Sequence, residues 1–304
     1  MTAPRCAVEP SGRRPWLADA VRRGGGEVVA PGDAEAIVWA DPKDADGLRR
    51  LLEEHPDIEW VQLPWAGIEP FVEVLDHDHR WTCGKGVYAE PVAEHALALA
   101  LTGMRGVGEY ATRQGWSAPQ GRNLIGANVT VLGGGGIARE FLRLLEPFDA
   151  RATVVRNRPD DLEGAARVVG PDGLHAALSD ADLVVLALAL TPDTTHIIDA
   201  DALERLPDHA WIVNVARGRH IATDALVDAL RSGSIGGAGL DVTDPEPLPD
   251  GHPLWELPNA IITPHVGNTP EMAVPLLSRR VTENVRRYAA GEPLLGPVHV
   301  DLGY

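Results

Sequence analysis

Short apolar runs alternate along the chain with longer segments whose apolar residues recur at helical spacing. In the first hundred residues, apolar runs predict four strands: Arg5–Glu9, Glu27–Ala30, Ala36–Ala40 and Ile58–Leu63. Helices are predicted over Pro15–Arg23, where three glycines follow, and over Lys43–Glu54. Short apolar strands separated by amphipathic helices are typical of a parallel sheet covered on both faces.

A second series of strands follows a continuously apolar segment, Val92–Arg105, which predicts a helix buried between two domains. Six strands are expected after it: Asn128–Leu132, Ala152–Val155, Leu183–Leu190, Trp211–Val215, Gly237–Val242 and Ala260–Thr263. With helices between them, they have the size of a dinucleotide-binding domain. Met272–Ala290 is amphipathic and predicts a helix that returns to the first domain. We therefore expect a dinucleotide-binding domain of residues 95–271 inserted into a substrate domain of residues 1–94 and 272–304.

A glycine-rich turn lies between the strand at Asn128–Leu132 and the helix after it. The frame G-x-G-x-x-A is formed by Gly133, Gly135 and Ala138. The first glycine allows a sharp turn, the second lets the backbone approach a pyrophosphate, and the alanine lets helix and strand pack closely. The helix start, with Gly136 and Ile137, would face the anion. A surface turn can match this pattern, but the flanking strand and helix favour a nucleotide site.

The next strand, Ala152–Val155, ends in Arg156-Asn157-Arg158. A site that prefers NAD places an Asp or Glu here to bind the ribose 2′-OH. Guanidinium groups pair instead with a 2′-phosphate, so these three residues predict NADP(H) as the preferred cofactor, with NAD(H) as the alternative. Two ordinary surface arginines are the competing interpretation.

Composition narrows the function classes. The 304 residues carry a formal net charge of −17, which disfavours binding to nucleic acid or to an anionic membrane. The two cysteines, Cys6 and Cys83, lie in no zinc-binding pattern, and no metal site is expected. No apolar run has the length of a signal peptide or a membrane span, so a soluble cytoplasmic protein is expected.

Three candidate catalytic residues follow the later strands, where ligands bind in open α/β sheets. Arg217 follows the strand at Trp211–Val215, and Glu246 lies in an acidic, proline-rich loop. His265 comes directly after the last strand. A histidine that a carboxylate orients and charges can exchange the proton of a hydroxyl group, and an arginine can hold a carboxylate or polarise a carbonyl. Each residue alone has an ordinary structural explanation, but the three together, after a dinucleotide loop, predict hydride transfer between an alcohol and a ketone.

Several motifs together resemble the D-isomer-specific 2-hydroxyacid dehydrogenase family, and the resemblance covers nearly the whole chain. They are Val92-Ala-Glu-His-Ala-Leu, Leu188-Ala-Leu-Thr191-Pro-Asp-Thr-Thr-His196, Asn214-Val-Ala-Arg217-Gly, Asp241 through Glu246-Pro, and Thr263-Pro-His265-Val-Gly267. Members include glyoxylate and hydroxypyruvate reductases, D-lactate dehydrogenase, phosphoglycerate dehydrogenase and formate dehydrogenase. The resemblance implies a Rossmann-type cofactor domain inserted into a flavodoxin-like substrate domain.

The family's residue roles can be carried over to matching positions. His265 would be the acid/base, Glu246 its partner and Arg217 the substrate clamp. Asp241 would hold the nicotinamide carboxamide. The resemblance also implies further cofactor contacts at Leu190, Thr191, Val215, Ala216 and Gly267.

The resemblance further implies that the backbone of Trp65-Ala66-Gly67 binds the substrate carboxylate. Trp65 departs from the small residue usual there, and Arg156 departs from the usual acid of NAD-dependent members.

The leading hypothesis is an NADP(H)-dependent reductase of a small 2-oxo acid, of the glyoxylate/hydroxypyruvate type and homodimeric like its family. A phosphoglycerate dehydrogenase-like enzyme is an alternative, although the Pro64–Phe71 loop offers no Lys or Arg for a phosphate. A non-catalytic nucleotide-sensing protein on the same fold is a second alternative, and formate dehydrogenase ranks lower.

Overall fold

The computed structural model describes residues 2–302 and divides the chain into two compact α/β units. The outer unit comprises the described residues up to Tyr88 and from Thr269 onward, and the inserted unit is Ala89–Asn268. The first boundary precedes the one expected after residue 94, because helix α3 begins at Ala89 and carries Pro91 in its first turn. Proline is tolerated there because the N–H that it lacks has no intrahelical partner at that position.

The outer unit contains a five-stranded parallel sheet in the order β2-β1-β3-β4-β5, which is the flavodoxin-like arrangement. Its elements are β1 (Arg5–Glu9), α1 (Trp16–Arg23), β2 (Glu27–Val28), β3 (Ala36–Trp39), α2 (Ala45–Glu54), β4 (Trp60–Gln62), β5 (Arg80–Thr82) and α9 (Pro270–Ala290). The sequence pattern missed β5, because only three residues form it and polar residues precede it.

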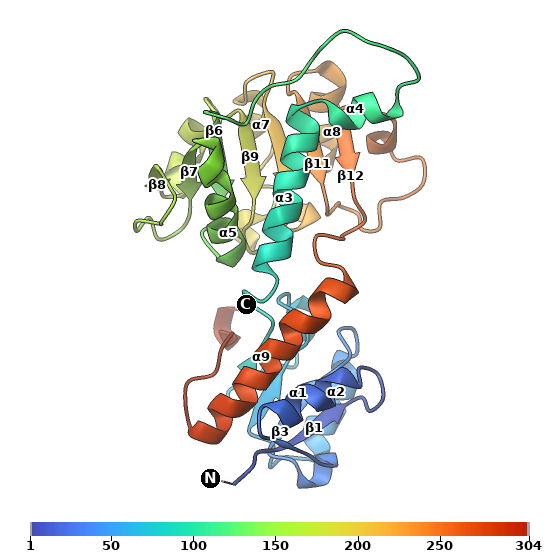
Figure 1. Ribbon diagram of the computed structural model, residues 1–304, viewed down its shortest axis with the longest axis vertical. Coiled ribbons are helices and arrows are strands. Elements are labelled where there is room, and N and C mark those ends of the chain that lie inside the picture. Colours follow the sequence, from blue (N-terminus) through green and yellow to red (C-terminus); the bar gives the residue numbers. More distant parts are fainter. Residues whose placement is uncertain (1, 303–304) are drawn as a thin grey trace. The chain divides into compact units, whose positions relative to one another are not determined.

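Helix α9 belongs to the outer unit, where it packs along α1 (Figure 1). The Thr282 hydroxyl donates a hydrogen bond to the Ala20 carbonyl oxygen at 3.0 Å, and Val281 and Val285 are fully buried. The last long helix of the chain therefore completes a sheet unit whose strands all come from the first ninety residues.

The inserted unit contains a seven-stranded parallel sheet in the order β12-β11-β10-β9-β6-β7-β8. The first strand of the series, β6, lies inside the sheet between β9 and β7, as in a Rossmann fold. Its helices are α3 (Ala89–Met104), α4 (Val107–Thr112), α5 (Gly136–Leu145), α6 (Leu174–Leu178), α7 (Ala200–Glu204) and α8 (Thr223–Ser232). Its strands are β6 (Asn128–Leu132), β7 (Arg151–Val155), β8 (Arg167–Val169), β9 (Leu183–Leu186), β10 (Trp211–Asn214), β11 (Gly237–Leu240) and β12 (Ala260–Ile262). Both sheets confirm the expected fold class.

This sheet differs from the sequence prediction in its number of strands and in where several strands end, β9 most of all. Strand β8 was not expected, and the sheet has seven strands rather than about six. Strand β9 ends at Leu186 and not at Leu190, because the next residues turn past the glycine loop and lead into Pro192. An apolar run does not show where its hydrogen-bonding partner strands end.

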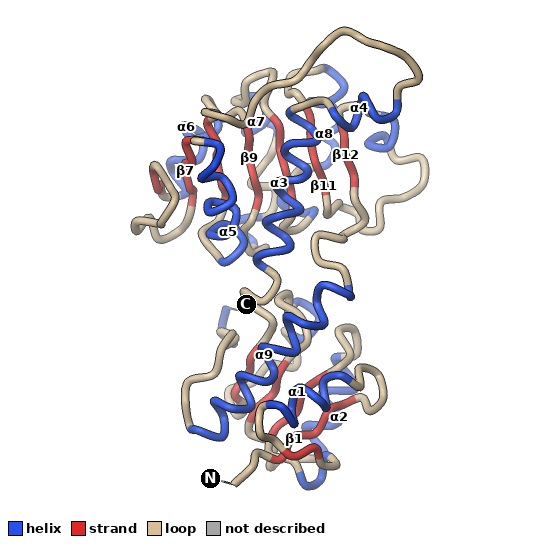
Figure 2. The backbone as a smooth tube through the Cα atoms, viewed as in Figure 1, coloured by secondary structure: helices blue, strands red, loops and turns tan. Residues whose placement is uncertain are grey.

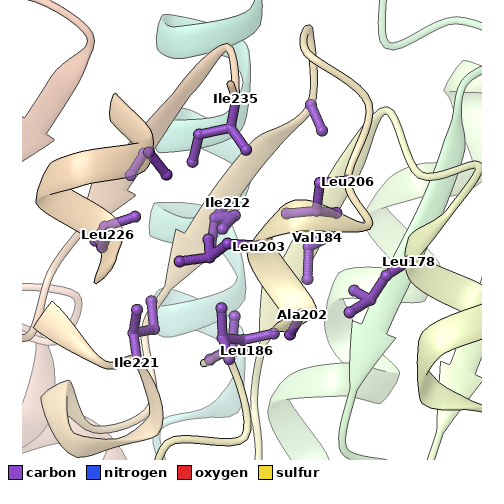
Figure 3. Packing of buried hydrophobic residues seen from close by; sticks show 14 of the residues in the cluster. Leu178, Val184, Leu186, Ala202, Leu203, Leu206, Ile212, Ile221, Leu226 and Ile235 are labelled. Atoms are coloured by element: carbon purple, nitrogen blue, oxygen red, sulfur yellow. The ribbon is translucent and has the colours of Figure 1, made fainter. Parts of the chain in front are cut away.

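Helices cover both faces of the seven-stranded sheet (Figure 2). On one face, Val184, Leu186 and Ile212 of the strands pack against Leu203 of α7 and Leu226 of α8 (Figure 3). Each is nearly or fully buried, which contributes about 1.5 to 3 kcal/mol per side chain. Helices α3 and α5 cover the other face. The helix expected between two domains thus forms part of the inserted unit's own core.

All seven strands are parallel, so the loops that follow them emerge at one edge of the sheet. That edge carries every candidate residue of the inserted unit. None of the described helices has the length and apolar character needed to cross a bilayer. Within residues 2–302, no three potential metal ligands gather into a group that could hold a metal ion.

Candidate active site

The glycine loop joins β6 to α5 beside the end of β9, where the strand order reverses. Gly133 has a φ of 108°, and a Cβ there would overlap the carbonyl oxygen of Ala187. Helix α5 begins at Gly136 behind Gly135, which caps it without a side-chain hydrogen bond and has open space where a Cβ would stand. Ala138 is fully buried. The loop thus presents unpaired backbone N–H groups of a helix start, the arrangement that binds phosphate.

Arg156 follows β7 and lies against this loop. A Cβ built on Gly134 would stand 2.8 Å from the Arg156 Cδ and 3.2 Å from its Cζ. Arg156 is half-buried, whereas Asn157 and Arg158 are exposed. The guanidinium group of Arg156 therefore borders the glycine loop, and the neighbouring pair projects towards solvent.

The segment after β9 carries Leu190 and Thr191, both half-buried. The Thr191 N–H donates to the Thr194 hydroxyl at 2.8 Å, which caps the short helix Pro192–Thr194. The hydroxyl of Thr194 in turn donates to the Ala189 carbonyl oxygen at 2.8 Å. These hydrogen bonds fix the segment beside the end of β6.

The turn that carries Arg217 is organised by Asn214, a buried residue at the end of β10. The Asn214 amide donates to the Arg217 carbonyl oxygen at 2.9 Å, and its Oδ1 accepts from the Ala216 N–H at 3.0 Å. Val215 and Ala216 are buried, and the half-buried Arg217 side chain donates from Nη1 to the Ala216 carbonyl oxygen at 2.8 Å. The guanidinium group is thereby held close to the turn.

The Arg217 turn rests directly on the acidic loop after β11. A Cβ on Gly218 would overlap the carbonyl group of Thr243, so only glycine permits this approach. Thr223, at the start of α8, donates to the Asp244 carbonyl oxygen at 2.8 Å and holds the same loop. The segments that carry Arg217 and Glu246 are therefore in contact.

His265 and Glu246 form the pair that the sequence predicted. The His265 Nδ1 lies 2.7 Å from the Glu246 Oε1, and the two side chains are 52% and 43% exposed. His265 adopts a left-handed backbone conformation with a φ of 54°, which costs free energy in a residue other than glycine. Glu246 takes one ring nitrogen, and no described residue forms a hydrogen bond with the other, Nε2.

Asp241 anchors the turn on which His265 stands. Its Oδ1 accepts from the Thr263 hydroxyl at 2.6 Å and from the Val266 N–H at 2.8 Å, and its Oδ2 accepts from the Gly267 N–H at 2.9 Å. The His95 Nε2 lies 3.3 Å from Oδ1. Burial alone would raise the pKa of Asp241, but these donors together lower it to about 2. The carboxylate therefore holds the turn on which His265 stands.

We expect this anchor to contribute stability that depends on pH. The pKa of Asp241 is depressed in the folded protein, so its contribution is fully present above the ordinary value of 3.8 and is lost as the pH falls through about 2. Asp241→Asn removes the ionisable group. The difference in unfolding free energy between wild type and variant should shrink by about 2 kcal/mol from about pH 5 to about pH 2. Denaturant unfolding across that range checks this, and a constant difference would contradict it.

The predicted substrate loop lies in the outer unit, after β4. Its Trp65 carbonyl oxygen accepts from the Gly84 N–H at 2.8 Å, which ties it to the loop after β5. Among the residues described, no acceptor faces the backbone N–H groups of Ala66 and Gly67. Two unpaired successive donors suit a carboxylate, which is the role expected for this loop.

Sequence reasoning gave no role to three residues that support the site. His95 binds the Thr263 hydroxyl at 2.9 Å, and Asn214 organises the Arg217 turn. His220 is fully buried, with ring nitrogens 3.0 Å from the Arg217 carbonyl oxygen and 3.3 Å from that of Ala189. Burial lowers the pKa of His220, which favours the neutral ring. His95 and Asn214 lie in motifs that the sequence displayed, but their partners come from distant segments.

Comparison with known proteins covers both units. Residues 96–267 match the family model of the D-isomer specific 2-hydroxyacid dehydrogenase, NAD binding domain. An uncharacterised protein in the proB 3′ region of Corynebacterium melassecola is 39% identical over 291 residues, which covers 91% of this chain and 95% of that protein. The human glyoxylate reductase/hydroxypyruvate reductase is 33% identical over 274 residues, covering 82% and 83% of the two chains.

A solved structure from Xanthobacter autotrophicus aligns over the full length of both chains, with a TM-score of 0.84 and 26% identity. That protein is described as a D-isomer specific 2-hydroxyacid dehydrogenase in complex with NADPH and MES.

Proposed function

Because the chain belongs to the D-isomer-specific 2-hydroxyacid dehydrogenase family, whose members are NAD(P)-dependent oxidoreductases, we propose that it reduces a small 2-oxo acid of the glyoxylate/hydroxypyruvate type. We further propose that NADPH is its preferred hydride donor, with NADH as a weaker substitute. The contact between His265 and Glu246 carries the proposal, since it supplies the acid/base that this reduction requires.

His265 delivers the proton in this scheme. Glu246 accepts from Nδ1 and stabilises the charged ring, so the proton on Nε2 is available to the carbonyl oxygen of the substrate. In the reverse direction Nε2 takes the hydroxyl proton. Arg217 holds the substrate carboxylate or polarises the carbonyl, and its half-buried position strengthens either interaction. In the outer unit, the free N–H groups of Ala66 and Gly67 are the proposed donors to the carboxylate.

The loops of the inserted unit fit a nicotinamide dinucleotide. The start of α5, with Gly135, Gly136 and Ile137, has no side-chain cap, and its N–H groups suit the pyrophosphate. The segments at Leu190–Thr191 and Val215–Ala216 emerge at the same edge of the sheet. Asp241 keeps acceptor capacity on Oδ2 for the carboxamide, next to Gly267. When bound, the nicotinamide supplies the hydride.

Arg156 supports the preference for NADPH. It borders the glycine loop, where an NAD-dependent member would carry an acid, and it offers donors rather than an acceptor. The Xanthobacter relative was solved with NADPH.

Oxidation of NADPH by a panel of 2-oxo acids tests the function. We expect measurable kcat/KM with glyoxylate or hydroxypyruvate, and a lower value with NADH in place of NADPH. Wild-type protein that binds NADPH but oxidises it with none of the acids would instead support a non-catalytic nucleotide sensor. The panel should include 3-phosphohydroxypyruvate, because the phosphoglycerate dehydrogenase-like alternative requires activity with a phosphorylated acid.

We also propose that the protein works as a homodimer in the cytoplasm. The loop that follows α4 extends away from the sheet and returns to β6 (Figure 1). It carries the fully exposed Trp116, and Ile125 near its end is 68% exposed. Exposed large apolar residues on one segment favour an interface with another protein, here a second copy. Cys6 and Cys83 are free and buried, which agrees with a reducing compartment.

Trp116→Asp should weaken the dimer. Loss of a central tryptophan from an interface typically costs about 2 kcal/mol or more, which corresponds to about a 30-fold rise in the dimer dissociation constant. Light scattering after size exclusion at decreasing protein concentration measures this. Trp255→Asp is the matched control, because Trp255 is 51% exposed on a different segment. Equal dissociation constants for wild type and Trp116→Asp would rule out this loop as the interface.

A further inference from the structure

In the outer unit, Arg14 is a cation that has no ion-pair partner among the residues that the structure describes. In its parallel sheet the strand order reverses between β1 and β3, and ligands bind in open sheets at the carboxyl ends beside such a point. The loop after β1 contains Arg13 and Arg14, and the loop after β3 contains Asp41. Arg13 forms an ion pair with Asp41, which leaves Arg14 to a different neighbour.

Arg14 lies over the indole ring of Trp65, the first residue of the predicted substrate loop. Its Cζ is 4.8 Å from the ring centroid, within the range of a cation–π contact. The Tyr88 ring also packs against Trp65, with centroids 5.6 Å apart, and its hydroxyl donates to the Pro64 carbonyl oxygen at 2.9 Å. Trp65 therefore cannot swing away without breaking two contacts, and it serves as a fixed platform for Arg14.

Arg14 itself is half-buried, and burial lowers its pKa. Within the described part of the chain, its guanidinium group forms no hydrogen bond and no ion pair. A partly desolvated cation without a hydrogen-bonding partner is energetically unfavourable unless a ligand supplies one. Stacking on an indole occupies the face of the guanidinium plane and leaves its N–H edge available for a carboxylate.

We propose that Arg14 binds a second acidic group at the far end of the substrate, so that the enzyme accepts 2-oxo dicarboxylic acids. This inference rests on the proposed function, in which Ala66 and Gly67 bind the carboxylate next to the reacting carbonyl. The Pro64–Phe71 loop has no basic residue of its own, and the sequence therefore indicated no cation for a second acidic group. Folding supplies one from a segment fifty residues earlier.

The cations near Arg14 favour a carboxylate over a phosphate. Arg13 is committed to Asp41. Arg280 donates to the carbonyl oxygens of Cys83 and Lys85, each at 3.0 Å. One guanidinium fork matches one carboxylate, whereas a phosphate dianion calls for further positive charge.

The test compares two 2-oxo acids of the same shape. Oxaloacetate has a terminal carboxylate where 4-methyl-2-oxopentanoate has an isopropyl group. We expect wild-type kcat/KM to favour oxaloacetate, and Arg14→Gln to lower the ratio of the two values by about 10- to 100-fold, mainly through KM. Arg14→Lys keeps the charge without the planar fork and should give an intermediate ratio. Arg22→Gln is the control, because Arg22 is exposed and pairs with Asp19 on α1.

An unchanged ratio in Arg14→Gln, with both acids reduced, would overturn this inference and leave the proposed function standing. A larger loss with 3-phosphohydroxypyruvate than with oxaloacetate would overturn the carboxylate in favour of a phosphate. If no 2-oxo acid is reduced, the proposed function fails. The acidic-group site is then tested by calorimetry, which compares the binding of succinate with that of 4-methylpentanoate. Succinate binding that is at least about tenfold weaker in Arg14→Gln supports the acidic-group site, and equal binding overturns it.

Discussion

His265→Ala should lower kcat for the 2-oxo acid by about 10² to 10⁴, the usual contribution of a general acid/base. The variant keeps Glu246 and Arg217 but has no group to deliver a proton at the position of Nε2. KM should change less than kcat, because the proposed carboxylate donors stay in place. Stopped-flow oxidation of NADPH measures the step itself. A rate within a factor of about three of wild type would eliminate His265 as the proton donor.

Two further variants separate chemistry from structure at this position. Asparagine tolerates the left-handed backbone that His265 adopts, so His265→Asn should lose activity without loss of stability. Glu246→Gln keeps the shape of the pair but removes the charge that stabilises the protonated ring. Reduction needs that proton, so Glu246→Gln should lower kcat for the 2-oxo acid. A kcat equal to that of wild type would show that the charge of Glu246 is not needed for proton delivery.

The second large effect concerns the cofactor. We expect wild type to prefer NADPH over NADH by about one to three orders of magnitude in kcat/KM, since each charge-assisted contact to a phosphate contributes about 1.5 to 3 kcal/mol. Arg156→Asp should erase or reverse that preference. The guanidinium group of Arg156 lies against Gly134 of the glycine loop, and an aspartate there would repel a 2′-phosphate and accept from a 2′-OH.

Arg151→Asp is the matched control for the cofactor experiment. Arg151 is the exposed first residue of the same strand, at the end opposite Arg156, so it changes the net charge equally and leaves the cofactor edge untouched. Its ratio of NADPH to NADH efficiency should equal that of wild type. Equal efficiency with both cofactors in wild type would mean that Arg156 does not recognise the phosphate.

Local patterns predicted most of the fold. In the strand Asn128–Leu132, Val129, Val131 and Leu132 are buried, and a run of such residues indicates a strand without knowledge of the neighbours. The sequence pattern did not predict strands β5 and β8, because three residues are too few to show a periodicity. These segments are strands because they pair with β4 and β7. The end of β9 was misplaced for the same reason, since only its neighbours define it.

The candidate site divides in a similar way. The placement of Arg217 and His265 beyond the ends of strands could be predicted, because the fold fixes where strand ends meet. The supporting contacts could not. His95 reaches Thr263 across 168 positions of sequence, and Arg14 reaches Trp65 from another loop. Such contacts depend on how the elements pack, and a single sequence has no local signal for them.

The interrupted outer unit has a consequence for the order of folding. Its sheet is synthesised first, but the helix that covers α1 is not complete until Ala290. Meanwhile the inserted unit is continuous and can fold as soon as it is synthesised. Its two ends meet inside it, because His95 near the start of α3 binds Thr263 and would stand 3.6 Å from a Cβ on Gly267. Folding of the inserted unit therefore brings together the two ends of a segment of about 180 residues. Helix α9 can then pack against α1 with little further loss of chain entropy.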